Sequence, residues 1–222
     1  MSADLIISYD GTSNDEDALA LGGLLGASGV KLALAYVRHA RDWNEARERI
    51  AQHDAARRLE QGARGLDGSV EQHVVFHAST PTGLEQLAAA EGAQVVVFGS
   101  EYRTSPGRAE PGTSAQQLLD GGPLAVAVAA AGLRVSRTPG VRSIAVAPPD
   151  QDAAAEATAH SLASALGAQI VDVATEPDLI VVGSSPGAAA GRISLSGSAR
   201  AALNSMRGSV LVVPAGTPLR LR

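Results

Sequence analysis

The residues best suited to bind a ligand lie in a loop near the middle of the chain. Val95–Phe98 is an apolar run of strand length that ends at Gly99, and a small-residue loop then leads to Gly112, Thr113 and Ser114. A helix that begins at a glycine and a hydroxyl can hold an oxyanion through backbone N–H groups, the hydroxyl and the positive end of the helix dipole. The pattern therefore predicts a phosphate site, and with it nucleotide binding.

The same pattern returns later in the chain. Leu179–Val182 and Gly183 repeat the apolar run and its glycine, and Gly187, Gly197 and Ser198 follow in the second loop. The weaker candidates for the phosphate site are Gly183, Gly187, Gly197 and Ser198, because the last two also suit the plain start of a helix. The repeat indicates that the chain consists of two related halves.

Asp10 is a candidate of another kind. It follows the apolar residues 5–9 and precedes Gly11 and Thr12. In open α/β sheets, ligands bind at the carboxyl ends of the strands where the winding changes direction. A carboxylate there can accept hydrogen bonds from ribose hydroxyls or from an adenine amino group. Asp beside Gly equally suits a turn, and Thr113 with Gln116 equally suits a capping box, so both plainer interpretations stay open.

The first half resembles the universal stress protein family. The phosphate loop of that family reads Gly, two residues, Gly, nine residues, Gly, and then Ser or Thr. Gly99, Gly112 and Thr113 keep this spacing, and Tyr102 stands at the position of the middle glycine. The likeness extends to residues 6–12 at the front and to residues 122–128 after the loop.

The second half carries the same motif with one shift. Gly187, nine residues, Gly197 and Ser198 fit the spacing, whereas Gly183 lies one residue too far upstream. At the front of this half, Pro148 and Pro149 replace the Asp-Gly step, and Asp150 comes too late. The chain is thus similar to a tandem member of the family, with a second loop that survives as a relic.

The resemblance implies a fold and a ligand. The fold is α/β, with two doubly wound parallel-sheet, flavodoxin-like units. In the family, an acidic residue after the first strand and backbone groups after the second contact ribose and adenine, which carries over to Asp10 and Val37. The implied cofactor is ATP with Mg²⁺. The last strand of each unit forms the family's dimer contact, so the two halves are expected to pair as an internal pseudo-dimer, and a homodimer is left open.

Tyr102 allows two opposite outcomes. Its side chain either covers the cleft and stacks on the base or ribose, or it fills the phosphate space and keeps the site empty. We favour the second, because the middle glycine normally lets the backbone approach phosphate. Gly112 is expected to matter for the same reason, and also because glycine can adopt a positive φ.

The elements that position these residues follow from the apolar periodicity. Strands are predicted at residues 5–9, 31–37, 70–76, 95–98 and 124–128, and helices at 14–27, 42–64, from Pro81 onward and at 113–119. In the second half, strands are predicted at 143–147, 169–173, 178–182 and 209–213, and a helix at 152–166. This alternation predicts a doubly wound parallel sheet with helices on both faces.

The second half is predicted to be a reduced copy. Four residues separate its strands at 169–173 and 178–182, whereas about fifty-seven separate Val37 from Val95. One stretch of helix, strand and helix is therefore missing. The predicted domains are 1–131 and 142–222, joined by a linker at 132–141.

Composition limits the function. The net charge of −5 and the pI near 5.5 argue against a nonspecific nucleic-acid surface. Without cysteine there are no disulfides or thiolate sites. No apolar run approaches membrane-spanning length and no signal peptide is recognised, so a cytoplasmic protein is expected. His73 and His77 lack the helical spacing of a zinc pair, and no metal site is predicted.

Three functions remain open. No catalytic set can be assembled from the sequence, so the preferred function is a noncatalytic nucleotide-responsive module of the stress-response type. The first rival is a slow ATP hydrolase, for which only Asp10, Glu101 and Glu110 could act near a γ-phosphate. The second is a protein-interaction module that has lost nucleotide binding, favoured by Tyr102 and by the reduced second half.

Overall fold

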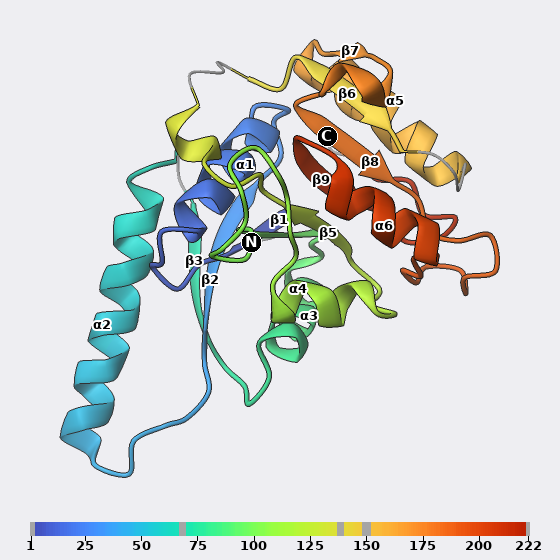
Figure 1. The fold of residues 1–222 in the computed structure, drawn as a ribbon. Coiled ribbons are helices and arrows are strands. Elements are labelled where there is room, and N and C mark those ends of the chain that lie inside the picture. Colours follow the sequence, from blue (N-terminus) through green and yellow to red (C-terminus); the bar gives the residue numbers. More distant parts are fainter. Residues whose placement is uncertain (1–2, 67–69, 137–139, 148–151, 221–222) are drawn as a thin grey trace.

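A single sheet runs through the molecule. The computed structural model describes residues 3–66, 70–136, 140–147 and 152–220. Its nine strands lie in the order β3-β2-β1-β4-β5-β9-β8-β6-β7, with helices on both faces (Figure 1). Neighbouring strands are parallel except for β5 and β9, which are antiparallel. The predicted α/β class is confirmed.

The first half alternates strands and helices as expected. In chain order it contains β1 (Leu5–Ser8), α1 (Asp15–Gly26), β2 (Leu32–Arg38), α2 (Glu45–Ala63), β3 (Glu71–Phe76), α3 (Thr80–Glu91), β4 (Val95–Phe98), α4 (Thr113–Leu119) and β5 (Ala125–Val128). Local chemistry sets several of these boundaries. The Asn44 side chain accepts from two N–H groups in the first turn of α2, and Ser79 caps α3 while Pro81 lies in its first turn.

The second half is shorter. It contains β6 (Ser143–Val146), α5 (Ala153–Leu166), β7 (Gln169–Ile170), β8 (Leu179–Val182), α6 (Gly197–Ser205) and β9 (Ser209–Val212). The predicted strand at 169–173 is wrong in its second part. There the Asp172 carboxylate accepts from the Ala174 N–H and starts a 3-10 helix, Val173–Thr175, which ends the pairing of an exposed edge strand.

The core consists of two apolar layers, one on each side of the sheet. The strands β4, β5, β8 and β9 are buried along their whole length, as strands covered on both faces must be. On one side the sheet packs against α1, α2 and α5, through residues such as Leu21, Leu59 and Leu162. On the other it packs against α3, α4 and α6, through Leu84, Leu118 and Leu203.

The last strands of the two halves meet at the centre of the sheet. Val126 pairs with Val212 and Val128 with Val210, in antiparallel register. The Ala130 N–H also donates to the Ser209 hydroxyl at 3.1 Å. The expected internal pairing is therefore present, and neither last strand is left as a free edge.

The predicted linker is partly folded. Leu133–Val135 forms a 3-10 helix, and the carboxylate of Asp17 holds it by accepting from the N–H groups of Gly132 and Arg134, each at 2.8 Å. The Arg134 guanidinium adds an ion pair to the same carboxylate at 2.9 Å. Asp17 is only 2 % exposed, so this network compensates a buried charge. Residues 137–139 of the linker lie outside the described residues.

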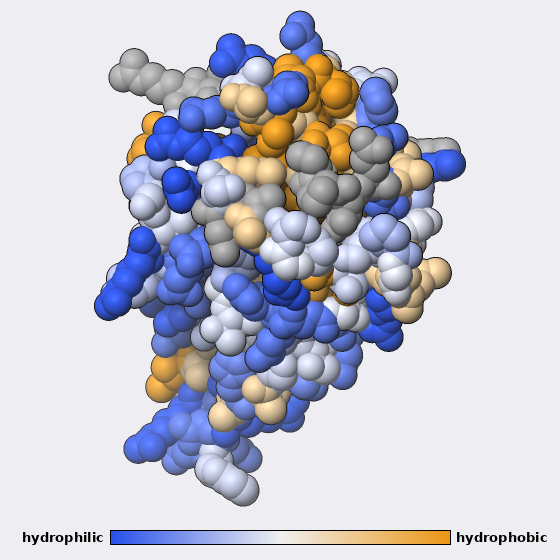
Figure 2. Space-filling view, turned by 45° about the vertical axis from the view of Figure 1, so that its right-hand side comes forward, coloured by the Kyte–Doolittle hydropathy of each residue, from blue (hydrophilic) through white to orange (hydrophobic). Residues whose placement is uncertain are grey.

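The face of the molecule drawn in Figure 2 is largely polar. Hydrophilic residues predominate on it, and hydrophobic ones gather in its upper part. Within the described ranges, no helix combines the length and the apolar character needed to cross a bilayer.

Candidate functional site

A cleft of about 620 Å³ opens at the carboxyl ends of β1, β2 and β4. In the first half the strand order is β3-β2-β1-β4-β5, so the winding changes direction between β1 and β4, where ligands of open α/β sheets bind. Seven of the predicted first-half residues line this cleft: Asp10, Thr12, Val37, Gly99, Gly112, Thr113 and Ser114. The eighth, Gly11, is not in its lining but lies between two residues that are.

Asp10 is a turn residue as well as a lining residue. Its carboxylate accepts from the Thr12 N–H at 3.0 Å, and its own N–H donates to the Asp15 carboxylate at 2.8 Å. Gly11 has φ of +89°, a left-handed conformation that glycine adopts without strain. The plain turn interpretation of Asp-Gly-Thr is therefore correct, and the exposed Asp10 still borders the cleft.

Asp15, which the sequence analysis did not single out, forms a carboxyl pair with Asp10. Partial burial, together with hydrogen bonding to the Asp10 side chain, raises the pKa of Asp15 from 3.8 to about 7. One Asp15 oxygen accepts from the N–H groups of both Asp10 and Thr12. The floor of the cleft thus carries a carboxyl group that takes up a proton near neutral pH.

Arg58 brings a positive charge to this acidic region. It comes from α2, donates to the Asp10 carbonyl at 3.1 Å, and stands over the Tyr36 ring at 5.5 Å from its centroid. Both side chains line the cleft. Sequence reasoning missed Arg58 because it lies among many charged residues of a solvated helix, and its contact with Asp10 spans 48 positions.

Gly99 and Gly112 of the phosphate loop are placed under different steric constraints. An ideal Cβ on Gly99 would lie 2.2 Å from the Asn14 carbonyl oxygen, so no side chain fits where β4 passes the start of α1. Gly112 has φ of −71°, so the expected need for a positive φ is wrong. A Cβ there would meet only the Glu101 carboxylate, at 3.4 Å. Gly112 therefore leaves open space beside the first turn of α4.

Tyr102 borders the cleft and does not fill it. The residue is 67 % exposed, and its hydroxyl accepts from the Arg103 guanidinium at 2.7 Å. The same guanidinium lies 5.1 Å from the centroid of the ring. A side chain packed into the phosphate space would be largely buried, so this exposure argues against the blocking alternative. That Tyr102 covers a bound nucleotide stays a prediction.

Solved structures that resemble this chain match it over nearly its whole length. A universal stress protein from Archaeoglobus fulgidus DSM 4304 has a TM-score of 0.70 at 12 % identity, covering 97 % of this chain and 100 % of that one. The chain has the fold of universal stress proteins. A protein of unknown function from Pseudomonas aeruginosa PAO1 reaches 0.63 at 15 % identity, covering 96 % and 93 %. A protein described as a universal stress protein, from Pseudomonas aeruginosa UCBPP-PA14, reaches 0.59 at 14 % identity, covering 95 % and 93 %. No family model and no curated protein matches the sequence.

Within this fold, the loops after β4 and β8 are closed by the same hydrogen bonds. The Ser100 hydroxyl donates to the Ala129 carbonyl, and the Ser184 hydroxyl donates to the Val213 carbonyl, which places equivalent residues 84 positions apart. Three backbone hydrogen bonds of the first loop recur in the second at the same offset. In the first loop, N–H groups donate to carbonyls from Glu101 to Glu110, from Gly107 to Ala131 and from Ala131 to Arg108. In the second, the corresponding bonds run from Ser185 to Ser194, from Gly191 to Ala215 and from Ala215 to Arg192. The two loops therefore share one frame.

This frame corrects the predicted match between the second loop and the first. Gly112 is equivalent to Ser196, whose hydroxyl caps α6 by accepting from an N–H of its first turn at 3.1 Å. Gly197 is equivalent to Thr113, so the apparent misplacement of Gly183 came from aligning the wrong residue of the helix start.

The second half has a hollow of its own, of about 310 Å³. The candidates Gly183, Gly187, Gly197 and Ser198 are all within the described chain, and none of them is in its lining. Residues 148–150, which would correspond to the turn at Asp10, lie outside the described residues.

Proposed function

We propose that the first half binds an adenine nucleotide, ATP with Mg²⁺, in the cleft, and that the chain is a noncatalytic, nucleotide-responsive member of the universal stress protein family. One observation carries the proposal. Residues from four separate segments, at positions 10 and 12, 37, 99 and 112–114, line one cleft at the point where the winding of the sheet changes direction. The sequence motifs that resemble the family's site are thus adjacent in space.

The residues present suit the parts of a nucleotide. The exposed carboxylate of Asp10 can accept from ribose hydroxyls, and the backbone at Val37 can contact the base. Gly112 leaves room beside the hydroxyls of Thr113 and Ser114 for phosphate oxygens. Arg58 supplies positive charge at the cleft, where phosphates would otherwise meet mostly carboxylates. Magnesium would reduce the remaining repulsion by neutralising phosphate charge.

A noncatalytic role is supported by the work that the Asp10 carboxylate already does. It accepts from the Thr12 N–H and so stabilises the Asp10–Thr12 turn. Asp15 accepts from N–H groups of the same turn, but its raised pKa leaves it able to take up a proton, so ADP production that depends on Asp15 would favour the hydrolase. Glu101 favours the rival interaction module, because its carboxylate lies close to Gly112, where a phosphate would have to approach.

Binding of ATP to the intact chain tests the proposal. Calorimetric titration with and without Mg²⁺ should give one site, and ATP at 100 times its Kd should add about 2.7 kcal/mol to the free energy of unfolding. Asp10→Ala and Gly112→Val should weaken binding sharply and leave the fold intact, since Gly112 has an ordinary backbone conformation. ADP should form no faster in the presence of the protein than in a solution of ATP alone.

The control is Gly197→Val at the helix start of the second half, where a Cβ meets nothing within 4 Å, and this variant should bind ATP as the wild type does. If Gly197→Val abolishes binding and Gly112→Val has no effect, the site lies in the other half. If the wild type binds no nucleotide, the proposal is wrong and the protein-interaction module becomes the preferred function. Steady ADP production that depends on Asp10 or Glu101 would replace it with the hydrolase.

A further inference from the structure

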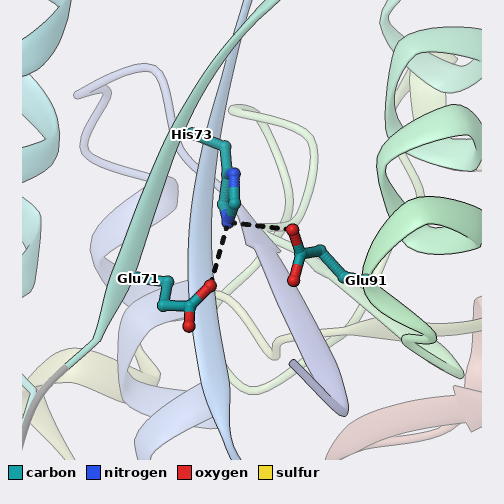
Figure 3. Close-up of side chains that lie close together, drawn as sticks. All are labelled: Glu71, His73 and Glu91. Carbon is teal, nitrogen blue, oxygen red and sulfur yellow. Dashed lines mark ion pairs between the residues drawn. The ribbon is translucent and has the colours of Figure 1, made fainter. Parts of the chain in front are cut away.

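Three metal-ligating side chains meet at the edge of the sheet farthest from the second half. Glu71 and His73 lie two residues apart on β3, so they point to the same face, and Glu91 is the last residue of α3, which packs there (Figure 3). The His73 Nε2 atom is 3.6 Å from a Glu71 carboxylate oxygen and 3.9 Å from one of Glu91. The three ligand atoms all lie within 4.8 Å of one another.

Hydrogen bonds do not account for this cluster. His73 Nε2 and Glu91 Oε2 are both buried, and neither has a hydrogen-bond partner among the described residues. A separation of 3.6 Å is too long for a hydrogen bond. The side chains are only 23 % (His73), 29 % (Glu71) and 16 % (Glu91) exposed, so two carboxylates repel each other in a partly desolvated place. The arrangement calls for a cation between them.

We propose that Glu71, His73 and Glu91 bind one divalent transition-metal ion, with Zn²⁺ as the best-fitting candidate. One imidazole and two carboxylates are donors that Zn²⁺ accepts, with water in the fourth position. Ligands at 2.0–2.2 Å from a tetrahedral zinc are roughly 3.3–3.5 Å apart. The observed separations of His73 Nε2 from the two carboxylates, 3.6 and 3.9 Å, need to close by only a few tenths of an ångström. The oxygens of Glu71 and Glu91, which lie within 4.8 Å of each other, must also approach one another. Mg²⁺ and Ca²⁺ fit poorly, because they prefer six or more oxygen ligands.

The site is separate from the nucleotide cleft. None of Glu71, His73 and Glu91 is in the lining of that cleft, although His73 pairs in register with Ala35, which is. A metal ion here would join the edge strand β3 to the end of α3 and so stabilise the first half. The second half lacks a counterpart of this strand and helix, so the site belongs to the first half alone.

Metal binding to the full-length, chelator-treated protein tests the proposal. Calorimetric titration should show one Zn²⁺ per chain, and Zn²⁺ but not Mg²⁺ or Ca²⁺ should raise the melting temperature. Glu91→Gln and Glu71→Gln keep the size of the side chain and remove the charge, and each should weaken binding about tenfold or more, as loss of even a second-shell partner does. His160→Ala, which removes an exposed histidine of α5, is the matched control and should bind as the wild type does.

A measurement on the wild type guards against variants that fold poorly. Stoichiometric Zn²⁺ should shift the imidazole resonances of His73 before those of the other four histidines. Bound Co²⁺ should show the intense visible bands of four-coordinate geometry. The proposal is overturned if the affinity for Zn²⁺ is unchanged in both glutamine variants, if it is lost in His160→Ala, or if His73 is not the first imidazole to respond. The cluster would then be an ion pair between a protonated His73 and its glutamates.

Discussion

The loop after β4 and the loop after β8 have the same frame and different contents. In both, a serine hydroxyl donates to the carbonyl of the residue directly after the last strand, Ser100 in one loop and Ser184 in the other. Yet the first loop borders a cleft of about 620 Å³, and the hollow of the second half is half that size, about 310 Å³. The hydrogen-bonded frame is therefore common to both halves, and it does not by itself set the size of the cleft beside it.

The main structural differences between the two halves lie outside these loops. The stretch of α2, β3 and α3 has no counterpart in the second half, and it supplies Arg58 to the cleft and all three ligands of the proposed metal site. The helix start differs too, because Gly112 leaves space where the equivalent Ser196 places a capping hydroxyl. Four changes to the chain test how far this contrast holds.

Separating the halves should have the largest effect. A fragment of residues 1–131 would expose β5, whose Val126 and Val128 are at most 1 % exposed and pair with β9 in the whole chain. Because a long apolar edge strand pairs with other chains, we expect self-association or loss of folding. Sedimentation of the fragment checks this. A stable fragment that stays monomeric would contradict it, and would show that the halves are independent.

Gly99→Ala should destabilise the whole chain by about 1–3 kcal/mol, the usual cost of overpacking. The added methyl group would lie 2.2 Å from the Asn14 carbonyl. Gly187→Ala in the second loop is the control, because a Cβ there meets nothing within 4 Å. Chemical denaturation measures both. Equal stability of the two variants would mean that the close approach of α1 to β4 is not a constraint.

Asp15→Asn should change how stability depends on pH. The native carboxyl keeps its proton up to about pH 7 and the unfolded one loses it near 3.8. The folded state therefore binds more protons in this window, and the free energy of unfolding should fall as the pH rises from about 4 to about 7. Asparagine keeps the acceptor oxygen and stays neutral, so the variant should lose this slope and exceed the wild type in stability at pH 8. Denaturation midpoints of both proteins between pH 4 and 8 test this prediction. It is wrong if the stability of the wild type and of the variant depends on pH in the same way.

Tyr102→Gly should have the smallest effect. Because the side chain borders the cleft and is 67 % exposed, its loss should weaken ATP binding only a few fold, by roughly the 1 kcal/mol of one aromatic contact. Titration of ATP into both proteins measures this. Tighter binding by the variant would restore the blocking role that the sequence favoured.

Much of the fold was predictable because it rests on local periodicity. Apolar runs and helical spacing place the elements to within a few residues, and the short interval between β7 and β8 shows directly that a stretch is missing. The exception, residues 169–173, lies at a sheet edge, where the Asp172 carboxylate competes for the backbone. The lining of the first-half cleft was predictable where residues follow a strand or start a helix, as Asp10 and Gly112 do.

The alternation of strands and helices, the repeat of the loop and the candidate ends of the strands can be read from the sequence, since these depend on residues near one another in the chain. Three other features are visible only in the folded chain. These are the contact of Arg58 with Asp10, the match of Gly112 with Ser196 in place of Gly197, and the cluster of Glu71, His73 and Glu91. Such contacts join residues on different elements, and their distances depend on how the helices pack on the sheet, which no local pattern records.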